Sequence, residues 1–343
     1  MTRALKVLSI GPAAAVQDLG RPGFIAKGLT RGGATDTLAV HEGAALLRQD
    51  PALAVLEIAS IGGVFEASED IRVAMTGADL TARIDDTAVA WNAVHLLQAG
   101  QTLSLGAART GSYAYLHVGG GFDTPLQMGA RGSHLSAGLG RLIASADHLP
   151  VGPDASTRTG LYLPTDARFS GGTVRIVPSV QTDRFTENER ARFCDTAFLR
   201  DPRANRQGVR MQHEGAGFAA EGARSIVSEV IVQGDIQITG DGTPFVLMCE
   251  SQTTGGYPRI GTVIPADLPR VAQAPAGAEI RFKFITLEEA IAAQTSFVKS
   301  VSDLRKRVVP LLRDVHDMAD LMTYQLISGA VSADADPFDN EGP

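Results

Sequence analysis

The sequence predicts a mainly β protein large enough for two packed domains. Short runs of β-branched residues alternate with turns that draw on 37 glycines and 17 prolines. Many short strands separated by turns at close intervals are typical of β-barrels and β-sandwiches. The 343 residues suffice for one large or two ordinary domains, and 44% hydrophobic with 20% charged residues is an ordinary globular balance.

The predicted strands are short apolar runs bounded by turn residues: Ile71–Met75, Tyr113–Val118, Thr173–Val177, Ile226–Val232, Pro244–Cys249, Ile260–Ile264 and Glu279–Phe284. Prolines and glycines punctuate residues 150–172, and we place the domain junction there. The predicted division is an N-terminal β domain over 1–160, a second β domain over 161–290, and a helical extension with a disordered tail over 291–343. The junction does not have the composition of a flexible linker, so the two domains are expected to pack on each other.

Helices are the minority. Asp36 is a predicted N-cap for a helix to Leu47, and Thr286 with Glu289 resembles a capping box. Pro310 breaks or kinks the helix that begins at Thr286. Two further helices are predicted over Asp183–Phe193 and Leu311–Ile327.

Charge and cysteine content exclude several classes of protein. The net charge of −7 disfavours a nucleic-acid-binding face. Two cysteines, Cys194 and Cys249, cannot supply zinc spacing, and no metal-ligand set is evident. The N-terminus lacks a signal-peptide pattern and no apolar run reaches the length of a membrane span, so a cytoplasmic protein without membrane contact is expected.

The most informative segment is Glu250–Val263, where polar residues and paired glycines stand between two predicted strands. Gln252, Thr253 and Thr254 offer groups that donate and accept hydrogen bonds, while Gly255 and Gly256 permit close backbone approach. Tyr257 adds an aromatic ring, and the Arg259 guanidinium suits a carboxylate or phosphate. The alternative is a glycine hairpin whose threonines satisfy their own backbone.

Five further strings combine glycines with charged residues. They are Val16–Gly23 with Asp18 and Arg21, Gly32–Asp36, Thr76–Leu80 with Gly77 and Asp79, Gly119–Asp123 followed by Gly129–His134 with Arg131 and Ser133, and Asn205–Arg210 with Arg206 and Arg210. Each has a structural alternative: a self-satisfied loop, a helix N-cap, a turn aspartate, a hydrogen-bonded histidine or surface ion pairs.

Taken in order, the six strings resemble those of the C-subunit family of bacterial 5-oxoprolinase, also described as allophanate hydrolase subunit 2-like, a biotin-dependent carboxyltransferase-like family. VQDLGRPG, TGAD and QTTGGYP match that family's strings residue for residue. The sequence departs from the family at Thr35 (usually methionine), His134 (commonly threonine), Asn205, Gln207, Gln212, and Glu250-Ser251 (often Asp-Arg). The resemblance covers about residues 5–290.

The resemblance implies two packed cyclophilin-like β-barrel domains, similar to half of the carboxyltransferase domain of urea carboxylase. It implies a subunit of an ATP-dependent 5-oxoprolinase, acting with a subunit-B protein and a YcsF/LamB-type subunit to open 5-oxoproline to glutamate. ATP would bind with the partner subunits, and any biotin would be carried on another protein. Carboxyl transfer to urea or another small amide, and a non-catalytic module that antagonises a kinase inhibitor, stay open, as does homo-oligomerisation.

Amide activation and carboxyl transfer both require oxyanion stabilisation. The hypothesised catalytic residues are Asp18, Arg21, Asp36, Arg206 and Arg210. The hypothesised substrate-binding residues are Gly77, Asp79, Arg131, Ser133, Gln252, Thr253, Thr254, Gly255, Gly256 and Tyr257. Alanine at Arg206 or Tyr257 is expected to abolish activity of the complex without unfolding the chain.

Overall fold

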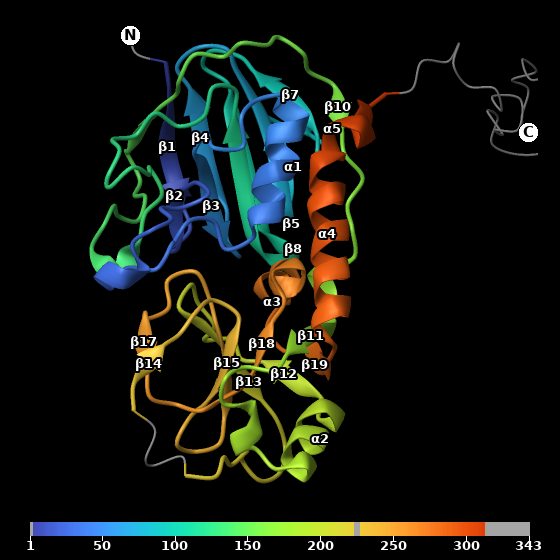
Figure 1. The fold of residues 1–343 in the computed structure, drawn as a ribbon. Helices are drawn as coiled ribbons and strands as arrows, with labels where there is room; N and C mark the ends of the chain where they lie inside the picture. Colours follow the sequence, from blue (N-terminus) through green and yellow to red (C-terminus); the bar gives the residue numbers. More distant parts are fainter. Residues whose placement is uncertain (1–2, 223–226, 313–343) are drawn as a thin grey trace, which may run out of the picture.

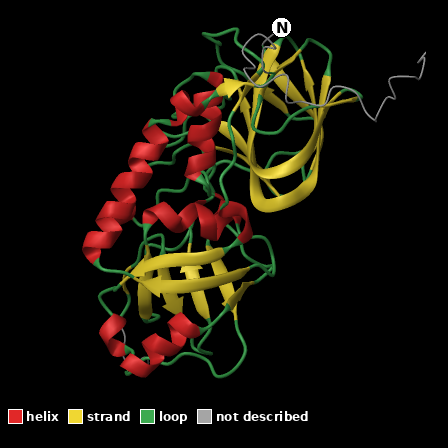
Figure 2. Cartoon of the chain, turned by 90° about the vertical axis from the view of Figure 1, so that its right-hand side faces the viewer, coloured by secondary structure: helices red, strands yellow, loops and turns green. Residues whose placement is uncertain are grey.

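The computed structural model describes residues 3–222 and 227–312, which form two stacked β lobes (Figure 1). The N-terminal lobe is an open sheet and the C-terminal lobe a closed barrel. Helix α3 (Leu268–Gln273) lies between the lobes, and the longer α4 (Leu287–Ser302) runs alongside both (Figures 1 and 2). The prediction of a mainly β fold with few short helices is confirmed.

The sheet lobe contains a nine-stranded sheet within residues 4–150. Its strands are β1 (Ala4–Ile10), β2 (Ala14–Gln17), β3 (Val55–Ala59), β4 (Gly63–Ala67), β5 (Ile71–Ile84), β6 (Thr87–Ala88), β7 (Val94–Leu97), β8 (Thr102–Val118) and β9 (His148–Pro150). The strand order is β2-β3-β8-β4-β1-β9, and β5 pairs with β6, β7 and β8. The long strand β8 therefore organises the sheet, because β3, β4 and β5 all hydrogen-bond to it.

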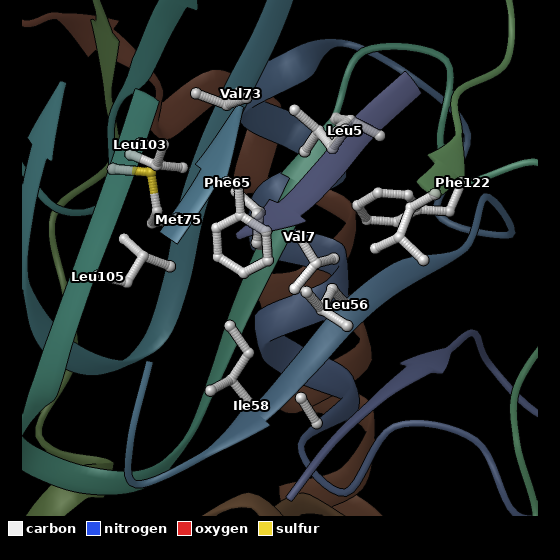
Figure 3. Close-up of a cluster of buried hydrophobic side chains, with 14 of the residues drawn as sticks. Leu5, Val7, Leu56, Ile58, Phe65, Val73, Met75, Leu103, Leu105 and Phe122 are labelled. Atoms are coloured by element: carbon white, nitrogen blue, oxygen red, sulfur yellow. The ribbon is translucent and has the colours of Figure 1, made fainter. Parts of the chain in front are cut away.

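The core of the sheet lobe is made by alternating apolar side chains that point to one side of the strands. Figure 3 shows Phe65, Leu56 and Met75 converging there with neighbours from β1 and β8. Phe65 and Leu56 are fully buried, and each buried side chain of this size contributes about 1.5–3 kcal/mol through loss of apolar contact with water.

The barrel lobe closes in the order β11-β18-β15-β16-β13-β12-β19. These strands are β11 (Gly172–Val177), β12 (Phe198–Arg200), β13 (Gly208–Gln212), β15 (Asp235–Ile238), β16 (Pro244–Leu247), β18 (Arg259–Val263) and β19 (Glu279–Phe284). The parallel pair of β11 and β19 completes the circle, which leaves no free sheet edge in these strands. Phe193, Phe198, Phe218 and Phe282 stack against one another in the barrel core.

Two short strand pairs lie outside these sheets. The ribbon of β14 (Glu229–Val230) and β17 (Thr254–Gly255) stands beside the barrel, and β10 (Leu161–Tyr162) pairs with β20 (Val309–Pro310). The predicted strand Ile226–Val232 is therefore mostly wrong. Within its described part only Glu229–Val230 is a strand, because β17 is the one short partner it finds.

The helices begin where the sequence places their caps. The Asp36 side chain accepts a hydrogen bond from Ala39 N and starts α1 (Thr37–Leu47), and both halves of the Thr286–Glu289 capping box form at α4. The predicted surface helix over Asp183–Phe193 is displaced: α2 covers Glu187–Asp195, because Thr186 accepts from Glu189 N and caps it there. The predicted helix Leu311–Ile327 lies almost wholly outside the described residues.

The C-terminal extension returns to the sheet lobe. Leu304 of α5 (Leu304–Arg307) joins Leu46 and Leu47 of α1 and Leu163 in one buried cluster, against which Phe297 of α4 packs. Arg305 also donates to the carbonyl of Gln49 at 2.9 Å. Residues from the two ends of the described chain therefore form one core. No helix in the described residues is long and apolar enough to span a membrane.

Replacing Leu304 by alanine should destabilise the sheet lobe, because the side chain is only 3% exposed in that shared cluster. We expect a loss of about 2–5 kcal/mol in the free energy of unfolding, measured by urea denaturation. Leu287→Ala is the matched control, since Leu287 is 63% exposed at the start of α4. Equal effects of the two substitutions would contradict the packing role of the extension.

Candidate functional site

The loop that contains Asp18 is held in place by hydrogen bonds to the Asp18 carboxylate. Asp18 Oδ1 accepts from Gly20 N at 2.8 Å, and Oδ2 accepts from Arg131 N at 2.7 Å and Gly132 N at 3.0 Å. The residue is 6% exposed. The Asp18 carboxylate therefore fastens two loops together through backbone N–H groups, and its catalytic role stays a prediction.

Arg21 is also placed differently from the prediction. It is 1% exposed and donates to the carbonyls of Gly132 and Gln127, so its charge faces backbone within the loops. Burial lowers the pKa of its guanidinium. Its Nη1 is buried without a hydrogen-bond partner, and the residue lines none of the three cavities described below, so its catalytic role stays a prediction.

The glycine string next to Asp36 packs directly on this loop. Gly33 has a φ of +79°, and a Cβ there would lie 2.5 Å from Gly20 N, so only glycine fits. The neighbouring Gly32 N donates to the carbonyl of Cys249 at 3.1 Å, and Thr30 Oγ1 donates to that of Ser251 at 3.0 Å. The N-terminal loops thus support the strand end that leads into Gln252.

His134 also helps to hold the backbone that precedes Gln252. Its Nε2 lies 2.9 Å from Thr30 Oγ1, its Nδ1 lies 3.2 Å from Ser136 Oγ, and Ser136 Oγ in turn donates to the carbonyl of Glu250 at 3.2 Å. Burial lowers the pKa of His134. The histidine is the hydrogen-bonded structural residue that one alternative anticipated.

Arg206 joins the two lobes at one point. Its Nε donates to Glu250 Oε1 at 2.7 Å, Nη2 donates to the Gly33 carbonyl at 2.6 Å, and Nη1 donates to both Thr35 Oγ1 at 2.9 Å and Glu57. Glu57 lies on β3 of the sheet lobe, whereas Arg206 precedes β13 of the barrel. All three nitrogens of this guanidinium donate to protein groups, so Arg206 bridges the two lobes.

Glu57 is a site residue that the sequence analysis missed. It is 4% exposed on β3, and Oε2 accepts from Thr35 N and from the Tyr115 hydroxyl, both at 2.7 Å. The available signal was a single carboxylate inside the apolar run Ala54–Ala59. A charge in such a run is rarely buried without a partner.

Asp36 lies in a buried hydrogen-bond network, and its catalytic role stays a prediction. It is fully buried and, besides capping α1, its Oδ2 accepts from Arg168 Nε and Gln273 Nε2, each at 2.9 Å. Gln273 ends α3, which lies between the lobes. The aspartate therefore helps to hold the barrel on the sheet lobe.

A cavity of about 590 Å³ opens on the barrel, and we name it the barrel pocket. Gln252, Gly255, Gly256 and Tyr257 form one side of it, and Arg203 and Arg210 are on its lining. Apolar side chains of Ile231, Phe245 and Leu247 complete the lining. Gln237 also lines it, is 7% exposed, and has an Nε2 with no hydrogen-bond partner. The pocket thus offers amide, guanidinium and apolar contacts to one small molecule.

Other residues of the Gln252 segment shape the barrel pocket without lining it. The Thr253 carbonyl accepts from Ile231 N at 3.0 Å, and Thr254 pairs with Val230 in the ribbon. Arg259 donates to Glu229 at 2.6 Å and to Asp235 at 3.3 Å, so the carboxylates that it binds belong to the protein itself. Its partners come from the neighbouring ribbon and strand β15.

A second cavity of about 490 Å³ lies where the lobes meet, and we name it the junction pocket. Its lining includes Glu57, Tyr113 and Arg206. Burial and the nearby Glu57 raise the pKa of the Tyr113 phenol, so it is a hydrogen-bond donor at neutral pH. Asn205 and Gln207 line both this cavity and the barrel pocket. Their short segment is therefore the partition between the two.

The remaining predicted residues lie elsewhere. Gly77 and Asp79 line a separate cavity on the sheet lobe. Arg131 pairs with Asp123 at 2.6 Å, and Ser133 Oγ lies 3.4 Å from the Arg141 carbonyl. Neither lines the barrel or junction pocket. Of the predicted set, the barrel pocket brings together Arg210, Gln252, Gly255, Gly256 and Tyr257.

The cysteines do not have the character of activated nucleophiles. Burial raises the pKa of Cys249 to about 11, which keeps the thiol protonated at neutral pH. Burial also raises the pKa of Cys194. Among residues 3–222 and 227–312, no group of three or more His, Cys, Asp or Glu side chains is arranged to hold a metal ion.

Comparison with known proteins identifies the family. The profile described as "Carboxyltransferase domain, subdomain A and B" matches residues 27–284, which spans both lobes. The chain belongs to this carboxyltransferase domain family. The C subunit of the 5-oxoprolinase of Escherichia coli (strain K12) is 35% identical over 298 residues, covering 84% of this chain and 94% of that protein. The C subunit of the Haemophilus influenzae 5-oxoprolinase is 30% identical over 291 residues, covering 83% and 93% respectively.

The fold of this family member is also found in a much larger protein. The crystal structure of the Kluyveromyces lactis urea amidolyase superposes with a TM-score of 0.78 at 22% identity, over 92% of this chain and 21% of that one. At this identity the likeness speaks for the fold alone. It confirms that the two-lobed arrangement is a recurring architecture.

Replacing Arg206 by alanine should destabilise the protein, contrary to the expectation from sequence that folding would be unaffected. The substitution leaves the buried carboxylates of Glu57 and Glu250 without their shared cation. Breaking a buried pair in this way costs about 3–5 kcal/mol, which chemical denaturation would measure. Arg281→Ala is the control, since the Arg281–Glu279 pair is exposed and should contribute less than about 1 kcal/mol. A similar small loss for Arg206→Ala would contradict the bridging role.

Proposed function

We propose that this chain is the C subunit of an ATP-dependent 5-oxoprolinase, which opens 5-oxoproline with ATP and water to give glutamate, ADP and phosphate. The observation that carries the proposal is the match to the C subunits of two 5-oxoprolinases across 94% and 93% of their lengths. The identity to the first is 35% over 298 residues, a stretch too long to be confined to one motif or one lobe.

The barrel pocket has the chemistry that 5-oxoproline requires. That molecule carries a carboxylate and a cyclic amide on a small, largely apolar ring. Arg210 donates to Asp201 Oδ2 at 3.1 Å and to Thr243 Oγ1 at 3.4 Å, and its remaining N–H groups suit the carboxylate. The Gln237 and Gln252 side-chain amides suit the ring amide. Gln237 Nε2 is a buried donor that lacks a partner, so an acceptor on the substrate would satisfy it. Phe245 and Leu247 supply apolar contact for the ring carbons.

Ring opening requires stabilisation of the charge that develops on the amide oxygen when water adds to the carbonyl carbon. The carbon–nitrogen bond then breaks and the ring nitrogen takes up a proton. In the proposed site the Gln252 amide and the Gly255–Gly256 backbone stand on one side of the pocket as donors for that oxygen. Asp18 and Arg21 act through position alone, since they hold the loops behind this segment.

The proposed enzyme is a complex. The sequence has no Walker loop or dinucleotide fingerprint, and we assign ATP binding to a site shared with a subunit-B protein and a YcsF/LamB-type subunit. The chain would contribute the barrel pocket, and the partners would supply what ATP-dependent activation of the amide needs.

A second function is favoured by the family description. The carboxyltransferase match supports transfer of a carboxyl group to urea or another small amide, with carboxybiotin carried on another protein. The same donors would then orient the acceptor amide. A non-catalytic regulatory role has no specific support from the geometry and is treated as an outcome of the experiment.

The test is ATP-dependent release of glutamate from 5-oxoproline by purified subunit-B and YcsF/LamB-type proteins, with this chain added or omitted. Release that requires the chain supports the proposal. Full release without it, or none from a complex shown to be assembled, contradicts it. In the second case, carboxyl transfer from carboxybiotin to urea is assayed next, and inactivity in both assays leaves the regulatory role.

Substitutions in the barrel pocket should affect turnover without unfolding the chain. Gln252→Ala removes a proposed oxyanion donor and should lower kcat about 100-fold. Arg210→Ala should act mainly on KM, raising it about tenfold, because a charge-assisted contact to the substrate contributes about 1.5–3 kcal/mol. Arg281→Ala, on the outside of the barrel, is the control and should leave both constants unchanged. Normal kinetics in both pocket variants would rule out the barrel pocket as the substrate site.

A further inference from the structure

A third cavity, of about 430 Å³, lies on the sheet lobe and shares no lining residue with the barrel or junction pocket. Its base is formed by the adjoining strands β5 and β8, and its wall by residues 162–170, the segment that leads toward the barrel. We name it the sheet cavity. Gly77 and Asp79 of the TGAD string line it, and the proposed function leaves this string without a role.

A bulge in β5 places Asp79 at this cavity. Gly77 has a φ of +75°, and a Cβ there would lie 2.4 Å from the Tyr113 carbonyl, so the strand can bend only at glycine. The pairing with β8 shifts between Gly77 and Asp79. Ala78 points into the core and is fully buried, so its two neighbours face the opposite side, where the cavity lies.

The sheet cavity carries a surplus of negative charge. Asp79 is balanced by Arg109, whose Nη2 donates to both carboxylate oxygens at 2.8 and 2.7 Å. Asp166 has no such exclusive partner. Its cation, Arg168, also pairs with Asp36 and Glu42, so one guanidinium serves three carboxylates. Burial raises the pKa of Glu42 to about 6, and it is therefore ionised at pH 7 and above.

An acceptor in the cavity lacks a donor. Asn92 lines the cavity, is 4% exposed, and its Oδ1 has no hydrogen-bond partner. Its backbone is held at a φ of +52°, with N–H bonded to the Met75 carbonyl at 3.0 Å and the carbonyl accepting from Leu163 N at 2.9 Å. The backbone of Asn92 is thus fixed on both sides. A buried polar atom of this kind costs about 1–3 kcal/mol when it stays unpaired.

Aromatic rings complete the lining. Trp91, Tyr162 and Phe169 border the same cavity, and the Arg168 guanidinium already lies over the Phe169 ring, 4.5 Å from its centroid. An aromatic face attracts a cation placed over it, and the flat rings also give apolar contact to a planar ligand. Together with the surplus of carboxylates and the unpaired acceptor, they favour a positively charged ligand that has N–H donors and an apolar body.

We propose that the sheet cavity is a second binding site, and that it takes a small organic ammonium or amidinium cation. The N–H donors of the ligand contact Asn92 and the carboxylates of Asp79 or Asp166, and its apolar body lies against the aromatic rings. The site is independent of the barrel pocket and of the proposed 5-oxoprolinase activity.

The experiment uses the full-length chain and the fluorescence of Trp91, which is the single tryptophan of the sequence. The probes are benzylamine and benzamidine, with benzyl alcohol and benzoate as the neutral and anionic counterparts. We expect a saturable change in Trp91 emission with the two cations, at least tenfold tighter than with either counterpart. N-acetyltryptophanamide controls for direct quenching.

Two variants locate the binding. Asp79→Asn should weaken benzylamine binding about tenfold, and Asn92→Gly, which suits the positive φ, should weaken it about fivefold, as expected for charged and neutral hydrogen bonds. Asp166→Asn repeats the charge test if Asp79→Asn fails to fold. Asp183→Asn, whose side chain is fully exposed on the barrel lobe, is the control and should bind as the original chain does.

Several outcomes would overturn the proposal. One is the absence of saturable binding by either cation to the folded chain. Another is equal or tighter binding of benzyl alcohol or benzoate, since the cavity would then not select positive charge. A third is unchanged affinity in each of the variants Asp79→Asn, Asp166→Asn and Asn92→Gly, which would show that the cation binds outside the sheet cavity.

Discussion

The arrangement of this protein depends on one buried cation, Arg206, held between carboxylates of two lobes. A guanidinium and two carboxylates removed from water are stable only when their hydrogen bonds are satisfied. Here Glu57 comes from the sheet lobe and Glu250 from the barrel lobe, and Arg206 is bonded to both. The geometry allows little freedom, because three nitrogens of the fork have defined partners. Residues 205 and 207, which line both adjacent cavities, are placed by the residue between them.

The glycine-rich strings of the N-terminal half serve mainly as a frame. Asp18 is saturated by backbone N–H groups, and Gly33 allows its loop to approach Gly20 more closely than any side chain would permit. This frame hydrogen-bonds to the carbonyls of Cys249 and Ser251, directly before Gln252. Residues that look reactive in the sequence thus act at a distance, by fixing a segment whose own amides and glycines face a pocket. Backbone donors keep their direction without a loss of side-chain conformational entropy.

Segments that are far apart in the chain pack against each other and stabilise the two-lobed structure. The C-terminal extension passes the barrel and packs with α1, so that Leu304 and Leu46 share one cluster. Helix α3 meets the sheet lobe through Gln273, whose amide accepts from Ser112 N and donates to Asp36. The apolar cluster around Leu304 and the hydrogen bonds of Gln273 both resist movement of the barrel lobe relative to the sheet lobe. The same contacts stabilise the sheet cavity, because its wall is the segment that crosses from one lobe to the other.

The sequence by itself determined the β class, the caps at Asp36 and Thr286, and the position of the Gln252 segment between two strands, since all three depend on local patterns of neighbouring residues. Only the tertiary structure decided which charged groups are free. Arg259 and Arg206 are alike in sequence terms, yet both are consumed by internal partners, and Asp79 belongs to a cavity away from Gln252. Glu57 lies 149 positions from Arg206 in the chain. The partner of a buried charge is set by which strands the fold brings together, and no spacing along the sequence carries that information.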